Sequence, residues 1–494
     1  FEQLNINPNL VSKNDFNPAF LFPPAQYGVT NDYYTDAFYG SAMVQHFSTL
    51  LEGGSSWTEG DKYIYHKGHN EVLWLTHYDV VKNLVDIIES TRELEQYNNL
   101  HQMARIWKVL TFQRLTDVYG DLPYSEAGLA YYKQITRPQY DKQEDIYADM
   151  LNELDDAVNK LRLDQRDYGE FDIFYAGDLA KWKKLGNTLM LRLGMRLSKV
   201  QPAEAEKWVK KAYSKGLFES NNDNLLVKFP SKTTVGYFHA LNWLMSQTGT
   251  ADSGKLAKTF VDFLKSHNDP RLQYTAGVYS NPQDPSTGNF DLAVQKGMPS
   301  GLTITSIVNH PSYDVNSPLG YNQYSGIRRD VYSKLDGVKI LVSYAKTQFL
   351  LAEAATRGWI SGNARDFYNN GVKGAMKMLS QYDPIASISD DEITTYLNNY
   401  PFVGTGNKEA AIEQISTQYW AAALFIGIEA WSNWRRTGYP KLIPTSYISN
   451  ETNGQIPRRL IYPDNELALN GEKFKEAIAR QGPDTFMTRV WWDK

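Results

Sequence analysis

The chain has 494 residues, of which 42% are hydrophobic, so it is long enough to bury a large core. Its 51 basic and 56 acidic residues give a net charge of -5, and this near-balance argues against a nucleic-acid-binding protein, which needs a strongly basic face. The absence of cysteine excludes disulfides, thiolate nucleophiles and cysteine-based metal sites from this sequence. No apolar run is long enough to cross a bilayer.

The first segment is rich in asparagine and proline, as in Asn7-Pro8-Asn9 and Phe22-Pro23-Pro24. This composition predicts an extended leader over residues 1–34 that lies over the body of the protein. Because the chain begins at Phe1, we expect any signal peptide and any lipidated N-terminal cysteine to lie outside it.

Apolar residues then recur at spacings of three and four, which is typical of amphipathic helices. The clearest example is 71–94, and a second helix at 100–119 stops at Gly120-Asp121-Leu122-Pro123, so the two predict an antiparallel hairpin. The same pattern predicts helices at 39–51, 142–163, 178–200, 202–215, 338–357, 364–380 and 410–434. Asp178 is expected to cap one of them. Repeated hairpins of this kind predict an all-α fold with tetratricopeptide-like stacking, mainly at 35–215 and 338–436.

Residues 232–336 differ from the helical body because they are rich in glycine, proline, serine, asparagine and tyrosine. This part predicts long loops with short helices, one of them at 254–265, and a few strands. Long loops in a helical protein are usually either functional or disordered, and the aromatic residues here favour the first. We therefore predict one domain, 1–494, whose loop-rich part at about 232–336 carries the ligand.

Two groups of residues are candidates for binding. The loop at 51–68 holds Trp57, Tyr63 and Tyr65, with Lys62 as a polar neighbour. In an extended stretch alternate side chains face the same way, so Tyr63 and Tyr65 could share one surface; the alternative is that they pack under the leader.

The second group lies in the loop-rich part, where Tyr321 and Tyr324 flank Asn322. Rings that stack, beside amides that donate and accept hydrogen bonds, suit a neutral sugar or a peptide backbone.

No motif for catalysis is present, whether a glycine-rich phosphate loop, a zinc-binding His-Glu-x-x-His or a Gly-x-Ser-x-Gly nucleophile turn. We predict a protein that is not an enzyme, with no catalytic residues, no metal ligands in its binding site and no cofactor. Asp269, Asp284 and Asp291 lie in the loop-rich part, where a weakly held calcium ion could bind; solvated surface carboxylates are the alternative.

Several segments are recognisable in their order and spacing. They are Arg105 to Leu110 with Asp117 to Ala127, Gly177-Asp178 with Asn187 to Leu197, Tyr344 to Trp359, Glu429-Ala430-Trp431 with Trp434 to Pro440, Ile456 to Pro463, and Val490-Trp491-Trp492-Asp493. Together they resemble the SusD/RagB family of nutrient-binding outer-membrane lipoproteins over the whole chain. The late Trp-Arg-Arg and Pro-Arg-Arg segments resemble the SusD-like branch rather than the starch-binding member itself.

The resemblance implies a protein lipid-anchored at the surface of a Bacteroidetes-type outer membrane, which sits as a lid on a SusC-like TonB-dependent transporter. It implies capture of a nutrient, an oligosaccharide or, as in RagB, a peptide, on loops at the exposed edge of the helices. The first inter-helix loop, 51–68, is one of these. Two other classes remain open: a helical scaffold that binds only protein, and a helical-toroid glycosidase.

Overall fold

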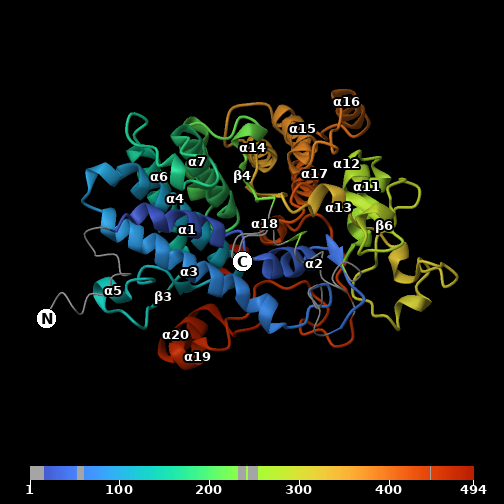
Figure 1. The fold of residues 1–494 in the computed structure, drawn as a ribbon, viewed down its shortest axis with the longest axis horizontal. Coiled ribbons are helices and arrows are strands. Elements are labelled where there is room, and N and C mark those ends of the chain that lie inside the picture. The colour runs from blue at the N-terminus through green and yellow to red at the C-terminus, as the bar shows by residue number, and fades with distance from the viewer. Residues whose placement is uncertain (1–15, 53–59, 232–240, 243–253, 446) are drawn as a thin grey trace.

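The computed structural model describes residues 16–494 apart from 53–59, 232–240, 243–253 and 446. Helices dominate it, which confirms the predicted all-α class. In Figure 1 the earlier long helices, α3 to α7, occupy one end of the long axis, and the short strands of the loop-rich part, around β6, occupy the other. Helices α14, α15 and α17 lie between them along one side.

The first group of long helices follows the predicted hairpins closely. It comprises α3 (Lys67–Thr91), α4 (Asn98–Tyr119), α6 (Gln143–Lys160), α7 (Leu179–Arg196) and α8 (Pro202–Ser214). Each of these helices packs on the next along the chain, so each buries its apolar face against its neighbours. Asp178 caps α7 as predicted, because its carboxylate accepts a hydrogen bond of 3.0 Å from the backbone N–H of Lys181.

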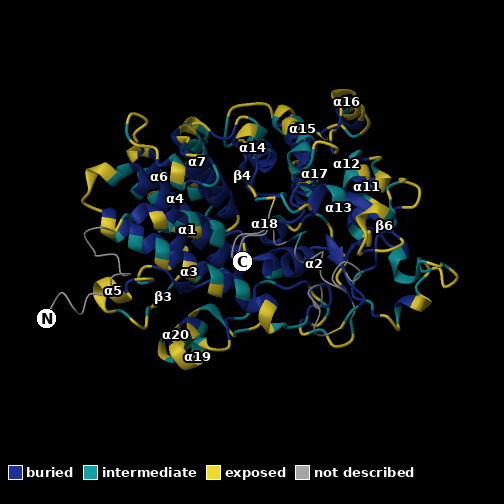
Figure 2. Ribbon diagram, viewed as in Figure 1, coloured by how far each residue is buried: buried dark blue, intermediate teal, exposed yellow. Residues whose placement is uncertain are grey.

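The second group packs on the first through α14, which contacts α7, α15 and α17. Its members are α14 (Tyr344–Arg357), α15 (Ala364–Tyr382), α16 (Asp390–Asn399), α17 (Lys408–Ala421) and α18 (Gly427–Thr437). Apart from a π-helix at Tyr34–Gly40 and short 3-10 helices, the remaining helices of the described residues are α1 (Phe22–Gly28), α2 (Ser41–Met43), α5 (Ala130–Lys133), α11 (Lys258–Ser266), α12 (Arg271–Thr275), α13 (Arg329–Tyr332), α19 (Glu466–Leu469) and α20 (Gly471–Gln481). Figure 2 shows that the central helices are mostly buried, whereas α5, α16, α19 and α20 are mostly exposed.

Short antiparallel strands tie distant segments together. The pairs are β1 (Phe47–Ser48) with β5 (Lys255–Leu256), β2 (Leu122–Pro123) with β3 (Tyr140–Asp141), and β4 (Leu225–Lys228) with β9 (Val338–Val342). A three-stranded sheet has the order β7 (Gly288–Asn289), β6 (Ala276–Tyr279), β8 (Gly326–Ile327). The pairing of β1 with β5 matters most here, because it joins the end of the first predicted helix to the start of the loop-rich part.

Four of the predicted elements are wrong. The expected extended leader is helical where it is described, at Pro18–Leu21 and in α1, because prolines occupy the first turns, where a missing N–H costs nothing. The helix expected at 39–51 ends at Met43, and β1 follows it. The helix expected at 338–357 begins only at Tyr344, because the preceding Val-Lys-Ile-Leu-Val run is strand β9 and Ser343 caps α14.

The helix expected at 410–434 is in fact two, α17 and α18. The chain turns between them at Phe425, whose φ is 67°. Gly427 then starts α18 so close to the backbone that an added Cβ would lie 2.0 Å from the Asp36 carbonyl oxygen. Glycine is therefore required at this position, and the apolar run that looked continuous hides the break.

Candidate functional site

The loop-rich part and the first inter-helix loop meet in space. Leu50, the residue just before that loop, packs with Met298, Ile307 and Tyr324 in a small apolar cluster separate from the main core. Leu302, Tyr313 and Tyr321 pack on this cluster and are only partly buried. Two segments that sequence reasoning expected to share a site are therefore adjacent, although residues 53–59 lie outside the described part.

Asp61 links these two segments through hydrogen bonds. Its carboxylate, fully buried, accepts hydrogen bonds from the Ser48 hydroxyl and the Gly301 backbone N–H, both at 3.0 Å. Its backbone carbonyl accepts another, of 2.8 Å, from the hydroxyl of Thr445. Asp61 thus links three segments, two through its buried carboxylate and one through its backbone carbonyl.

Three tyrosines lie together in and on the small apolar cluster. The ring centroids of Tyr313 and Tyr321 are 5.9 Å apart, and those of Tyr313 and Tyr324 are 6.5 Å apart with an interplanar angle of 27°. Tyr313 and Tyr321 are half-buried, so their outer surface is accessible, whereas Tyr324 is fully buried beneath them. We call Tyr313 and Tyr321 the tyrosine platform.

The platform rests on a partly buried polar layer. Lys296 Nζ lies 4.8 Å from the centroid of the Tyr324 ring and donates hydrogen bonds of 2.7 Å to the Ser312 carbonyl and to Gln323 Oε1. The Tyr324 hydroxyl lies 2.9 Å from the hydroxyl of Ser312. Burial lowers the pKa of Lys296 and raises that of Tyr324. This layer holds the loop backbone in place under the rings.

Asn322 places a polar group beside the platform. Its Oδ1 accepts a hydrogen bond of 2.8 Å from Lys255 Nζ. Because an ammonium group can only donate, this contact fixes which end of the amide faces Lys255, and the amide NH₂ points away from it. No acceptor for that NH₂ is found among the described residues, and the side chain is half-exposed. The NH₂ is therefore a free donor beside the rings.

The structure places the other predicted residues differently. Trp57 lies outside the described residues. Lys62 is fully buried and donates a hydrogen bond of 2.7 Å to the Thr49 carbonyl, and Tyr63 is also fully buried. Tyr65 is half-buried, and its hydroxyl donates to Asp464 at 2.9 Å. The idea that Tyr63 and Tyr65 share one surface is wrong, because Tyr63 has a φ of 59° and the stretch is not extended.

Sequence reasoning also missed members of the site. Tyr313, Ser312 and Lys296 lie 8 or more residues from Tyr321 in the chain, and no spacing connects them. The only available signal was the richness of this loop region in tyrosine, which does not say which rings are buried. The prediction that Tyr324 itself stacks on a ligand is corrected, because the ring is covered by its neighbours.

The calcium suggestion is not supported at these positions. Asp269 is buried and bound by the Arg271 guanidinium at 2.5 Å, so its charge is already neutralised. The Asp284 and Asp291 carboxylates accept hydrogen bonds from the backbone N–H groups of Ser286 and Ala293, each at 2.9 Å. Within the described ranges no cluster of three or more aspartate, glutamate or histidine side chains could hold a metal ion.

Comparison with known proteins agrees with this architecture. Residues 8–463 match the model of the SusD-like family described as "Starch-binding associating with outer membrane". A solved structure named "chitin-binding protein" is 37% identical, with a TM-score of 0.82 over 97% of this chain and 100% of its own. A Bacteroidetes SusD-like protein is 28% identical, with a TM-score of 0.84 over the same shares.

A third structure, a chitin-binding SusD homologue from Flavobacterium johnsoniae, is 25% identical with a TM-score of 0.75, and 97% of each chain is covered. No curated protein sequence matches the chain. Among the described helices, none combines the length and apolarity that crossing a bilayer requires.

Proposed function

We propose a function for this chain from one premise: it belongs to the SusD-like family, whose members bind glycan and associate with the outer membrane. The protein captures a chitin-type oligosaccharide, built of β-1,4-linked N-acetylglucosamine, at the cell surface. It then delivers this ligand to a SusC-like TonB-dependent transporter in the outer membrane. A lipid anchor preceding this chain holds it at that membrane. The protein acts by binding and not by catalysis.

The tyrosine platform is the observation that carries this proposal. A pyranose ring presents C–H groups on its faces, and these pack on an accessible aromatic ring. Tyr313 and Tyr321 lie 5.9 Å apart, which suits contact with neighbouring parts of one chain of sugars. The free NH₂ of Asn322 supplies a donor for a carbonyl or hydroxyl oxygen of the same ligand.

The choice of sugar rests on chemistry and on similarity. The acetamido group of N-acetylglucosamine adds a carbonyl oxygen that the Asn322 NH₂ can bind, and sugar hydroxyls can accept the same hydrogen bond. The relative at 37% identity is named a chitin-binding protein, and its similarity extends over 97% of this chain. This similarity is what favours chitin-type ligands over starch-type ligands, and the Asn322 donor is compatible with them.

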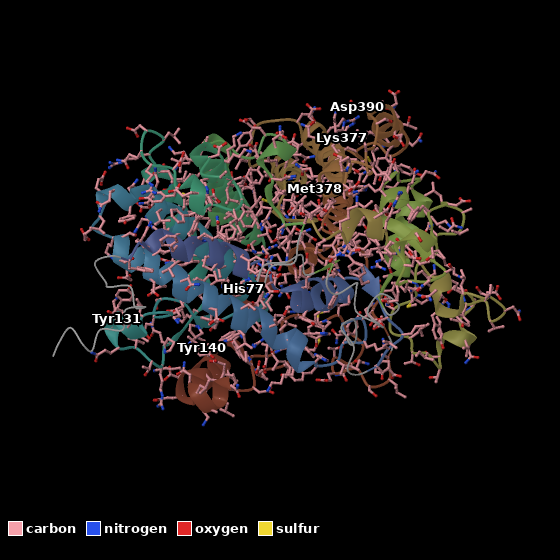
Figure 3. All side chains as sticks on the ribbon, viewed as in Figure 1. His77, Tyr131, Tyr140, Lys377, Met378 and Asp390 are labelled. Atoms are coloured by element: carbon pink, nitrogen blue, oxygen red, sulfur yellow. The ribbon has the colours of Figure 1, made fainter. Side chains whose placement is uncertain are left out.

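Calorimetric titration tests the proposal with three probes: the N-acetylglucosamine hexamer, the α-1,4-linked glucose hexamer and a neutral hexapeptide. We expect binding of the first alone. In Tyr321→Ala, loss of one stacked ring should weaken that binding about tenfold, or about 1.4 kcal/mol. Tyr131→Ala is the matched control, because Tyr131 is 75% exposed on α5, at the opposite end of the molecule from the loop-rich part (Figure 3). It should bind normally.

Other outcomes would reject specific parts of the proposal. If only the glucose hexamer binds, the ligand is a starch-type sugar and not a chitin-type one. If only the peptide binds, the protein is a peptide-binding member of the family. Equal affinity in Tyr321→Ala and the parent chain would move the site away from the platform. Shortened sugars after prolonged incubation would show an enzyme instead.

Purification from membranes tests delivery. The full-length lipidated protein, extracted in mild detergent, should co-purify with a TonB-dependent barrel. Recovery of the protein without any barrel would reject the transporter part and leave the glycan site untouched.

A further inference from the structure

His310 begins the turn that carries one ring of the tyrosine platform. The backbone N–H of Tyr313 donates a hydrogen bond of 2.9 Å to the His310 carbonyl, which closes a turn over residues 310–313. The His310 ring bonds the backbone of the same turn. The backbone N–H of Ser312, the residue before Tyr313, donates to His310 Nδ1 at 3.1 Å. The turn that orients Tyr313 is therefore held in part by an imidazole ring.

The contact with Ser312 fixes where the His310 ring carries its proton. A backbone N–H can only donate, so Nδ1 accepts and has no hydrogen of its own. The neutral ring then carries its single hydrogen on Nε2. A second proton would have to bind at Nδ1, where it would face the Ser312 N–H, and two donors cannot bond each other. The hydrogen bond made by the neutral ring is therefore lost when the ring becomes charged.

The loop-rich part uses the same local hydrogen bond at other positions, but with oxygen acceptors. In these Asx turns a side-chain oxygen accepts from the backbone N–H two residues further on. The acceptors are Asn281, Asp284, Asn289, Asp291 and Asp314. An amide does not titrate and a carboxylate ordinarily takes up its proton near pH 4, whereas an imidazole does so between about pH 5 and 8. His310 thus occupies the acceptor position of such a turn with a group that titrates near neutral pH.

Protonation of His310 would also reach the residues under the platform. The Ser312 hydroxyl lies 2.8 Å from His310 Nδ1 and 2.9 Å from the Tyr324 hydroxyl, so the polar atoms form a chain. A charged ring would donate to the Ser312 oxygen, and the serine hydrogen would then turn towards Tyr324. Both changes act on Ser312, whose peptide bond leads directly to Tyr313.

His310 is half-buried, so solvent protons reach its ring. The helix before it, η8 (Ile307–Asn309), adds no titratable group. The other titratable groups next to the turn, among the described residues, are Lys296, Tyr313, Asp314 and Tyr324. Amines, phenols and carboxylates ordinarily titrate outside the range from pH 5.5 to 7.5. Within this cluster, the imidazole is therefore the group expected to change its charge in that range.

We propose that His310 is a pH-dependent positioning residue for the glycan site: the neutral ring holds Tyr313 in place and the charged ring releases it. Glycan then binds more tightly at pH 7.5 than at pH 5.5. This inference rests on the proposed function, because it concerns affinity at the tyrosine platform. By linkage, glycan binding favours the neutral ring and releases protons at a pH where His310 is partly charged.

Two variants at one position separate titration from structure. In His310→Asn an amide oxygen takes the place of Nδ1 and accepts from the Ser312 N–H at either pH, as in the Asx turns. In His310→Ala the acceptor is absent. Calorimetric titration of the parent chain with the N-acetylglucosamine hexamer should show about fivefold weaker binding at pH 5.5 than at pH 7.5, the effect of one hydrogen bond. His310→Asn should bind tightly at both pH values, and His310→Ala weakly at both.

His267→Asn is the matched control. His267 Nδ1 lies 2.8 Å from the Phe263 carbonyl, which can only accept, so Nδ1 already carries a hydrogen and a second proton leaves this hydrogen bond intact. The variant should keep the pH dependence of the parent chain. At pH 6.5, binding heats in two buffers of different ionisation enthalpy should show proton release by the parent chain and by His267→Asn, but not by His310→Asn.

Hydrogen exchange without ligand tests the turn independently of glycan binding. After correction for the chemical exchange rate at each pH, the amides of Ser312 and Tyr313 should open more often at pH 5.5 than at pH 7.5 in the parent chain. In His310→Asn they should open equally at both. If the hexamer does not bind at pH 7.5 but exchange shows this difference, the proposed function fails and the pH-dependent release of Tyr313 stands.

Three results would overturn the proposal. The first is equal affinity of the parent chain for the hexamer at the two pH values, and the second is a pH dependence that persists in His310→Asn. The third is exchange at Ser312 and Tyr313 that does not depend on pH. Melting temperatures at both pH values check that each variant folds. If His310→Ala does not fold, the comparison of the parent chain with His310→Asn decides alone.

Discussion

The helical body and the loop-rich part are stabilised by different interactions. In the body, backbone groups are satisfied within each helix, so the side chains are free to pack, and buried charges pair with one another. Arg436 contacts Glu353 at 2.5 Å, and Arg196 contacts Glu429 at 2.9 Å, both fully in the interior. In the loop-rich part, side chains such as Lys296 and Gln323 satisfy the backbone instead.

The difference follows from the backbone's need for hydrogen bonds. A loop that is buried without a helix or a sheet must use side chains to satisfy its N–H and C=O groups. Removing one such side chain loosens one loop, whereas removing one member of a buried ion pair leaves an uncompensated charge in a packed core. We therefore expect large global effects in the body and small local ones near the platform.

The largest effect is expected at Glu353. Burial opposes ionisation, but Arg436 and Arg357 dominate and lower the pKa of Glu353 to about 2, against an ordinary value of 4.5. A depressed carboxyl pKa stabilises the fold fully above pH 4.5, and this contribution is lost as the pH falls from 4.5 towards 2. This depression of the pKa corresponds to about 3 kcal/mol.

Glu353→Gln should therefore lower the free energy of unfolding by about 3 kcal/mol at pH 7, and the gap from the parent chain should narrow below pH 4.5. Denaturant titrations across this pH range measure it. Glu204→Gln, on the exposed face of α8, is the control and should have little effect. A gap that stays constant down to pH 3 would show that the Glu353 charge is not the cause.

Lys346, also in the helical body, has the opposite effect on the stability of the fold. Its Nζ is buried without a hydrogen-bond partner in the described structure, and burial lowers its pKa to about 7 from 10.5. A depressed lysine pKa means that the fold loses stability as the pH falls from 10.5 to 7, and carries the full penalty below 7.

Lys346→Met keeps the length of the side chain and removes the charge, so it should stabilise the protein by about 2 kcal/mol at pH 7. The gain should shrink as the pH rises towards 10. Lys475→Met on α20 is the exposed control. Destabilisation by Lys346→Met would show that the ammonium group contributes to holding Glu429, whose charge lies nearby.

The difference between the helical body and the loop-rich part also explains which features the sequence could predict. The periodic apolar residues predict the ends of most of the long helices to within a few residues, because packing is the main requirement in the helical body. The errors fall where a local contact overrides the period: the strand at Val338–Val342 pairs with β4, and Gly427 fits against the Asp36 carbonyl. Arg436 pairs with Glu353, 83 residues away in the chain, and no periodicity predicts such a contact.

The candidate site was less predictable, for a physical reason. Tyr321 and Asn322 lie at the surface, but Tyr324, two positions further on, is buried. No periodicity applies in an irregular loop, so burial there depends on contacts such as that of Lys296 with Gln323, which are 27 residues apart. Lys62 and Tyr63 look like surface residues in sequence for the same reason.

The smallest expected change in stability concerns the loop-rich part. Tyr324→Phe keeps the buried ring under the platform and removes only the hydroxyl that lies 2.9 Å from the Ser312 hydroxyl. Loss of one such hydrogen bond should cost about 1 kcal/mol. Because the bond joins two points of one loop, we expect faster amide hydrogen exchange in residues 310–325 and no change in α14 or α15. Glycan affinity should fall less than in Tyr321→Ala, because the accessible rings remain.

Tyr332→Phe is the matched control, since its buried hydroxyl lies 3.4 Å from that of Thr275, away from the platform. Faster exchange throughout the body in Tyr324→Phe would mean that the loop-rich part and the helices unfold as one unit, and the contrast between the two regions would then fail.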